Sequence, residues 1–100
     1  MNLIYHIVLA TDWKQQETQT DYKAASLQTE GFIHLSQKEQ VNGTLNRYYQ
    51  NTPNLLLLHV DANRLKHELK YEASTNNELF PHLYGPLNKD AIVRIEELSV

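Results

Sequence analysis

The chain contains no cysteine among its 100 residues, which excludes disulfide frameworks, thiolate metal sites and cysteine nucleophiles. Long hydrophobic runs are also missing, because the longest aliphatic stretch, Leu55 to Leu58, is far too short to span a bilayer. The N-terminal residues show neither the basic flank nor the apolar length of a signal peptide. We therefore expect a cytoplasmic protein that has no membrane partner.

Clusters of positive charge are absent as well, since lysine and arginine are scattered and the formal net charge is −3. Duplex nucleic acid is bound by clustered basic residues, so we expect no duplex partner. A small nucleotide stays compatible with this composition, because one or two cations are enough to hold its phosphates. The sequence also lacks the glycine motifs of phosphate-binding loops and dinucleotide folds, and the serine motif of α/β-hydrolases.

The hydrophobic pattern predicts a single domain over residues 1–100, because a chain of this length with 41% apolar residues supports one core. Apolar, β-prone runs predict strands at Leu3–Leu9, Phe32–Leu35, Leu55–Val60, Leu69–Ala73 and Ala91–Leu98. Helical patterns begin at Thr11, within 22–30, and at Ser36, where Glu39 completes a capping box. Strands and helices without regular alternation predict an α+β fold.

Two short segments place an imidazole between residues that restrict the backbone: Gly31-Phe32-Ile33-His34-Leu35-Ser36 and Leu79-Phe80-Pro81-His82-Leu83-Tyr84-Gly85. A rigid backbone around a group that titrates near physiological pH suits a site. His34 is either a site residue at the end of a strand or a core histidine bonded to a carbonyl, and the local sequence favours neither. The second segment is predicted to be rigid and irregular, and its His82 and Tyr84 share one face if it is extended.

Other polar residues are weaker candidates for a functional site. His6 lies within a strand pattern, which by itself favours a structural role. Glu72 is either a group that orients a histidine or acts as an acid–base catalyst, or a plain surface carboxylate. Ser36 begins a helix, and a helix N-terminus can hold a phosphate. Because the histidines have no paired metal-ligand spacing, we predict no metal site, with a divalent cation as a minor alternative.

Several of these residues together resemble one family: Tyr5-His6-Ile7, Trp13, Tyr22, Gly31 to Ser36, Gln40, Glu72 and Phe80 to Gly85. The chain resembles, from Ile4 to Leu98, the small bacterial family known as domain of unknown function nine-fifty-two. That family is similar in fold to the ADP-ribosyltransferases. The resemblance therefore implies two small antiparallel sheets in a split, ADP-ribosylation-like arrangement with short helices, which binds a nicotinamide dinucleotide (NAD).

The same resemblance implies roles for individual residues. His6 stands where a first-strand side chain contacts the adenosine ribose, and His34 stands near a tyrosine that stacks on nicotinamide. The third strand of such enzymes carries a catalytic glutamate, but the matching region here holds Pro81 and His82. A histidine does not supply that negative charge at neutral pH, and Glu72 lies elsewhere. The likeness thus argues against conventional protein ADP-ribosylation.

We accordingly predict an ADP-ribosyltransferase-like domain whose histidine-lined cleft binds a nucleotide of the NAD or ADP-ribose type, or another phosphorylated ligand. Transfer and hydrolysis are the candidate reactions; no cofactor is assigned, and NAD is a candidate substrate. The predicted catalytic residues are His34, His82 and Glu72, and the predicted ligand-binding residues are His6, Trp13, Ser36 and Tyr84. The alternative is a non-catalytic ligand-sensing or protein-interaction domain on the same scaffold.

Overall fold

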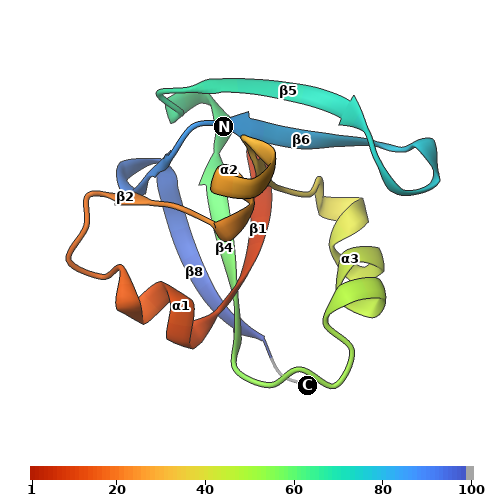
Figure 1. Cartoon of the computed structure of the whole chain (residues 1–100), viewed down its shortest axis with the longest axis horizontal. Coiled ribbons are helices and arrows are strands. Elements are labelled where there is room, and N and C mark those ends of the chain that lie inside the picture. The colour runs from red at the N-terminus through yellow and green to blue at the C-terminus, as the bar shows by residue number, and fades with distance from the viewer. Residues whose placement is uncertain (99–100) are drawn as a thin grey trace.

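The longest β-prone runs form the larger sheet of the molecule (Figure 1). The computed structural model describes residues 1–98, in which β1 (Leu3–Leu9), β4 (Leu55–Asp61) and β8 (Ile92–Leu98) pair antiparallel in the order β1-β4-β8. The central strand β4 is apolar on both faces, which is the pattern of a strand covered on both sides. Leu58 and Val60 of this strand are fully buried.

A smaller sheet contains both histidine segments. It consists of β3 (Ile33–His34), β6 (Leu79–Tyr84) and β5 (Glu68–Ala73), antiparallel in the order β3-β6-β5. The prediction of an irregular segment over 79–85 is wrong, because β6 is a regular central strand. Pairing on both sides outweighs the proline, whose carbonyl also accepts a hydrogen bond from the N–H of Leu35 at 3.0 Å.

Two further pairings join these sheets. A two-stranded sheet is formed by β2 (Asp21–Tyr22) and β7 (Leu87–Asn88). An isolated bridge links Tyr5 of β1 to Ser36, just after β3, through reciprocal backbone hydrogen bonds of 2.8 and 2.7 Å. This bridge brings the first strand of the large sheet beside the end of β3.

The helices are short, and one of them begins later than predicted. They are α1 (Ala10–Gln15), α2 (Ala25–Glu30) and α3 (Val41–Tyr48), with 3-10 turns at Lys38–Gln40, Ala62–Arg64, Thr75–Asn77 and Lys89–Ala91. Ser36 is not a helix cap, because its backbone pairs with Tyr5; Gln37 and Gln40 form the capping box instead. The helix α2 ends at Gly31, whose φ of 87° requires glycine.

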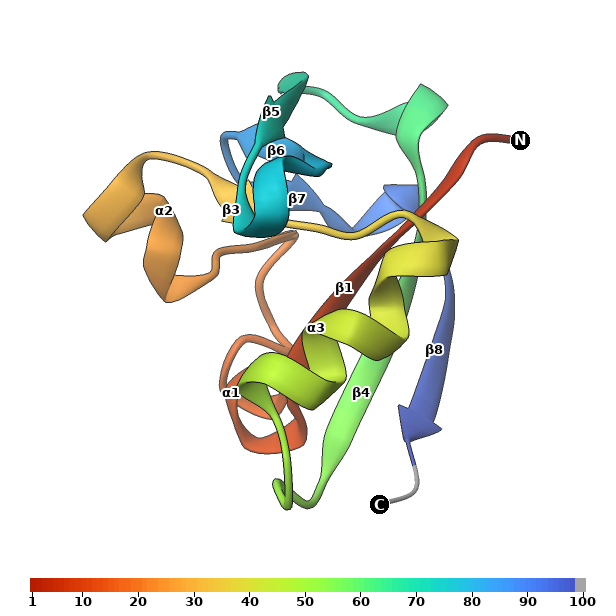
Figure 2. The same ribbon diagram turned by 90° about the vertical axis from the view of Figure 1, so that its right-hand side faces the viewer.

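Two groups of buried side chains form the core. The larger lies between the sheets and contains Ile4, Val8, Tyr22, Ile33, Leu35, Leu58, Val60, Leu83, Leu87 and Ala91. The smaller lies between the large sheet and α3, which crosses β1 and β4 in Figure 2. The prediction of an α+β fold with small antiparallel sheets and short helices is confirmed. Within residues 1–98, no helix is long and apolar enough to cross a membrane.

Candidate functional site

A pocket of about 530 Å³ lies beside β1, with residues of α2 and α3 on its walls. The bridge between Tyr5 and Ser36 forms part of this wall, so the pocket touches both the large sheet and the connection that follows β3. Its polar lining comes from His6, His34, Ser36, Thr44, Arg47 and the acidic Asp12 and Glu30. Ligand pockets of globular proteins commonly have about this volume.

His6 is a buried histidine whose two ring nitrogens both have partners. Nδ1 lies 2.7 Å from the carbonyl oxygen of His34, so this nitrogen carries the hydrogen. In the neutral ring Nε2 then accepts from the Tyr22 hydroxyl at 3.0 Å. Burial lowers the pKa of His6 to about 4 and raises the pKa of Tyr22. A ligand that bonds to the ring nitrogens of His6 has to displace one of these partners.

His34 lies at the edge of the pocket and is the most accessible of the three histidines, with 47% of its side chain exposed. Its Nε2 lies 3.0 Å from Oε2 of Glu30, at the end of α2. A surface pair of this kind holds a side chain weakly, by at most about 1 kcal/mol. The ring of His34 also packs against the rings of Phe32 and His82, whose centroids lie 4.9 and 5.1 Å from its own.

Ser36 and Thr44 place two hydroxyl groups on the wall below α3. The Thr44 hydroxyl donates to the carbonyl of Gln40 at 3.2 Å, and Ser36 Oγ lies 3.2 Å from Thr44 Oγ1. Arg47 follows one turn later and also lines the pocket. Among residues 1–98, no carboxylate forms an ion pair with its guanidinium, which lies 5.8 Å from the centre of the Tyr48 ring.

Sequence reasoning did not identify Thr44 and Arg47. The spacing of these two positions, three residues apart, places them on one face of α3. This spacing was available in the sequence, but it indicates a site only once the face is known to border a pocket. That information comes from the packing of α3 against β1.

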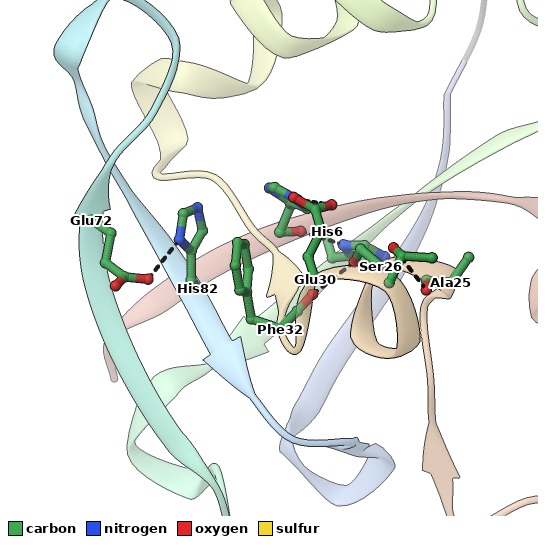
Figure 3. Close-up of polar contacts among 9 residues, drawn as sticks. His6, Ala25, Ser26, Glu30, Phe32, Glu72 and His82 are labelled. Atoms are coloured by element: carbon green, nitrogen blue, oxygen red, sulfur yellow. Dashed lines mark hydrogen bonds and ion pairs between the residues drawn. The ribbon is translucent and has the colours of Figure 1, made fainter.

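A second polar cluster lies across the small sheet and is centred on His82 (Figure 3). Nδ1 of His82 lies 2.9 Å from Oε1 of Glu72, and the Tyr84 hydroxyl donates to the same oxygen at 2.6 Å. The bond from Tyr84, followed by that from His82, lowers the pKa of Glu72. The bond to Glu72 in turn raises the pKa of Tyr84. The carboxylate is therefore ionised and has two donors at neutral pH.

The other nitrogen of His82 has no such partner. The residue is only 4% exposed, yet no protein group of the described chain bonds to its Nε2. The Phe32 ring stacks on the imidazole with centroids 4.2 Å apart, and the His34 ring lies edge-on with its centroid at 5.1 Å. An unpaired buried polar atom costs about 1–3 kcal/mol. Such an atom in a folded protein calls for an explanation.

The structure thus divides the predicted site residues into three places. His6, His34 and Ser36 line the pocket, whereas Glu72, His82 and Tyr84 form the neighbouring cluster. The two groups meet where the His34 and His82 rings are in contact.

Trp13 lies outside the pocket, in a separate shallow hollow with Lys89 and Arg94. Its ring is 5.6 Å from the ring of Tyr22 and lies under the Lys89 ammonium group. Tyr22 therefore stands between Trp13 and His6. Across residues 1–98, no three His, Asp or Glu side chains are grouped so that they could hold a metal ion.

Comparison with known proteins places this arrangement among uncharacterised relatives. The family described as "Protein of unknown function (DUF952)" matches residues 7–95. The crystal structure of protein CC0527 from Caulobacter crescentus is similar, with a TM-score of 0.91 and 37% identity, covering 99% of this chain and 88% of that chain. The solution NMR structure of CC0527 has a TM-score of 0.85 and 38% identity, covering 100% and 87% respectively. No curated protein matches the sequence.

Proposed function

We propose that this chain, which belongs to the DUF952 family of proteins of unknown function, binds a nucleotide of the NAD or ADP-ribose type in the pocket beside β1. The observation that carries the proposal is the composition of the pocket wall. Arg47, which has no carboxylate partner among residues 1–98, lines the pocket with the hydroxyl groups of Ser36 and Thr44, and several tyrosines line it as well. A dinucleotide combines the same two requirements, namely charged phosphates and flat apolar rings.

The phosphate part of the proposal depends on α3 and the bridge before it. The guanidinium of Arg47 is a planar donor that can bond to two phosphate oxygens at once. Ser36 and Thr44 supply hydroxyl groups within reach of each other, at 3.2 Å. His34 adds an exposed imidazole at the edge of the same pocket. Together these groups can donate hydrogen bonds to one or two phosphates. An apolar ligand would leave them without hydrogen-bond partners.

The ring-binding part of the proposal depends on tyrosines. Tyr22, Tyr48 and Tyr49 line the pocket, as does Phe80 of β6. Aromatic faces stack well on bases and nicotinamide, and they bury area at little cost in conformational entropy. An ADP-ribosyltransferase-like arrangement of the two three-stranded sheets would place a dinucleotide here, near the first-strand His6.

Transfer and hydrolysis are the reactions we propose for this site, with His34, His82 and Glu72 as the catalytic groups. Support comes from the contact between the His34 and His82 rings and from the bond that ties His82 to Glu72. In the proposed ADP-ribosyltransferase-like arrangement, β6 would take the place of the glutamate-bearing strand, and β6 holds no acidic residue. Glu72 of β5 is the carboxylate bonded to His82, and its negative charge is stabilised by two hydrogen-bond donors.

The proposal is tested by measuring the affinity for ADP-ribose and NAD with titration calorimetry and thermal unfolding. Ligand at 100 times its dissociation constant is expected to stabilise the fold by about 2.7 kcal/mol. Arg47→Ala should weaken binding about tenfold or more, because charge-assisted hydrogen bonds are lost. Arg94→Ala is the matched control, since it removes the same charge from the other hollow. Absence of any thermal shift with millimolar ligand would refute the proposal.

The alternative, a non-catalytic sensing or interaction domain, is favoured by one observation. β6 holds no acidic residue where the resemblance to the transferases implies a catalytic glutamate. Incubation with NAD and chromatographic analysis separates the two functions. Release of nicotinamide that disappears in His82→Asn supports the enzyme, whereas tight binding without turnover supports the sensing domain.

A further inference from the structure

The proposed nucleotide pocket leaves one buried group unexplained, the Nε2 atom of His82. This atom is the one buried side-chain nitrogen or oxygen without a hydrogen-bond partner among the described residues. By contrast, the equally buried His6 has partners on both nitrogens. Within residues 1–98 an unsatisfied buried side-chain donor or acceptor thus occurs only at His82, whose ring contacts that of His34 at the pocket edge.

The hydrogen bonds of the cluster determine which form of His82 is present. Nδ1 lies 2.9 Å from Oε1 of Glu72, and an ionised carboxylate only accepts hydrogen bonds. Nδ1 therefore carries the hydrogen, and in the neutral ring Nε2 presents a lone pair. Tyr84 donates to the same carboxylate oxygen and keeps Glu72 in position. The imidazole is thus oriented by its neighbours as a hydrogen-bond acceptor.

Strand order determines the direction in which this lone pair points. Because β6 lies between β5 and β3, Glu72 is on one side of His82 and His34 is on the other. The two nitrogens of an imidazole flank the same carbon and direct their hydrogen bonds outward in different directions, so Nε2 is turned away from Glu72, as Figure 3 shows. The His34 ring is close by, with its centroid 5.1 Å from that of His82.

The cover over this nitrogen can move. His34 is half exposed, and the only side-chain partner that its ring bonds among the described residues is the surface residue Glu30. Its ring also forms part of the pocket wall. A change of rotamer at His34 would therefore open a path from the pocket to His82. The cost of breaking a surface pair is smaller than the cost of leaving a buried acceptor without a donor.

We infer that Nε2 of His82 accepts a hydrogen bond from a sugar hydroxyl of the bound ligand, after the His34 side chain turns aside. Glu72 and Tyr84 are then positioning residues, which keep the imidazole in its acceptor form. This inference rests on the proposed function, because the ligand of the pocket supplies the donor. The inference also predicts selectivity. The pocket should bind a ribosyl phosphate more tightly than a phosphate compound that has no hydroxyl donor.

The first experiment observes the imidazole nitrogens of the wild-type protein by two-bond ¹H–¹⁵N NMR. We expect His82 as the Nδ1-protonated tautomer, and we expect ADP-ribose to shift its Nε2 resonance. Pyrophosphate, which has phosphates and no sugar, should shift Ser36 and Thr44 but leave Nε2 of His82 unchanged. An Nε2-protonated His82, or an equal shift with pyrophosphate, overturns the inference.

Failure of the inference and failure of the proposed function are distinguishable in the same spectra. If ADP-ribose shifts the amide signals of Ser36 and Thr44 but not Nε2 of His82, the pocket binds the ligand and the inference is wrong. If ADP-ribose shifts none of these signals at millimolar concentration, the proposed function is wrong and the inference falls with it.

The second experiment uses variants. His82→Asn keeps an N–H that can donate to Glu72 and removes the Nε2 acceptor, so ADP-ribose should bind about tenfold more weakly, with pyrophosphate affinity unchanged. His59→Asn is the matched control, because His59 also lies 2.9 Å from a glutamate, Glu96, but on the large sheet. An equal loss in both variants, or no loss in His82→Asn, contradicts the inference.

The positioning role of Glu72 is tested by the tautomer of His82, which would not change if Glu72 only stabilised the fold. Glu72→Gln should give a mixture of His82 tautomers in the ¹⁵N spectrum and an intermediate loss of ADP-ribose affinity. Tyr84→Phe should retain the Nδ1-protonated tautomer, since Glu72 still accepts from His82. A pure Nδ1-protonated tautomer in Glu72→Gln would show that this carboxylate does not position the ring.

Discussion

The two three-stranded sheets each hold a histidine 2.9 Å from a glutamate, and the two pairs have different surroundings. In the large sheet, the pair of His59 and Glu96 joins β4 to β8, and the imidazole lies edge-on to Tyr5 with 14% of its side chain exposed. In the small sheet, the pair of His82 and Glu72 is more deeply buried at the histidine. Only there does a ring nitrogen within residues 1–98 lack both solvent and a partner.

This difference shows that an imidazole–carboxylate pair does not by itself mark a site. What matters is the second nitrogen of the ring. In the large sheet, α3 covers the face that carries Tyr5 and Leu57, so the neighbourhood of His59 is filled by packing. In the small sheet, the rings of Phe32 and His34 cover His82, and the His34 ring also borders a pocket. A cover that also borders a pocket is what makes the second pair the better candidate.

The largest expected effect is on stability, and it tests whether the two sheets unfold together as one cooperative unit. Leu58 of the large sheet and Leu83 of the small sheet are both 0% exposed and belong to the same core cluster. Leu58→Ala and Leu83→Ala should each lower the free energy of unfolding by about 2–5 kcal/mol. Urea unfolding followed by amide NMR should show both sheets lost together. Loss of the small sheet alone in Leu83→Ala would mean that the sheets fold independently.

The pH dependence of stability is the next effect in size, and it arises from His6 in the large sheet. The unfolded ring binds a proton below its ordinary pKa of 6.5, whereas the folded ring does so only below about 4. The unfolded state therefore binds more protons in this interval, and stability should fall by about 3 kcal/mol as the pH drops through it. His6→Phe should remove this slope, and the exposed His67→Ala should keep it. Urea unfolding at several pH values measures both.

A direct comparison of the two buried histidines uses the same substitution at each. His6→Phe leaves the Tyr22 hydroxyl and the His34 carbonyl without their partner, so the loss of stability should be about 2 kcal/mol. His82→Phe removes the unpaired Nε2 together with one bond to the partly exposed Glu72, which keeps Tyr84 as a donor, so the loss should be less than about 1 kcal/mol. Thermal and urea unfolding of both variants provide the measurement. Equal losses would show that Nε2 of His82 has a partner in solution.

The smallest effect concerns the pair on the large sheet. Glu96→Gln keeps the shape of the side chain and removes the charge next to His59, on a partly exposed surface. Pairs of this kind contribute about 0–1 kcal/mol, so the free energy of unfolding should change by less than about 1 kcal/mol. A larger loss would mean that this pair is a structural element of the large sheet, comparable with its core leucines.

Much of the strand pattern was predictable, because long runs carry a clear hydrophobic signal. The first strand has the predicted bounds, and the predicted strands at 55–60, 69–73 and 91–98 differ from β4, β5 and β8 by one residue each. These segments are apolar on one or both faces, and local sequence suffices to recognise them. The predictions failed where a distant partner overrides a local signal. Ser36 has the sequence of a helix cap, but its backbone bonds to Tyr5.

The candidate site was predictable in its residue types and not in its grouping. The histidines of both segments were identified because glycine, proline and apolar neighbours mark their positions. Trp13 was expected at the ligand, but the ring of Tyr22 separates it from His6. Arg47 was missed, because a single arginine on a short helix has no distinctive pattern. Only the packing of α3 against β1 shows that its face borders the pocket.

The sequence by itself determined the family, the long strands and the set of histidines, since motifs and hydrophobic periodicity are local properties. Tertiary structure alone decided which ring nitrogens have partners. The partners of His6 are 16 and 28 residues away, and the partner of His82 comes from the neighbouring strand. Hydrogen-bond satisfaction depends on groups that only folding brings together. For that reason His6 became a structural link between sheets, while Nε2 of His82 has no partner within residues 1–98.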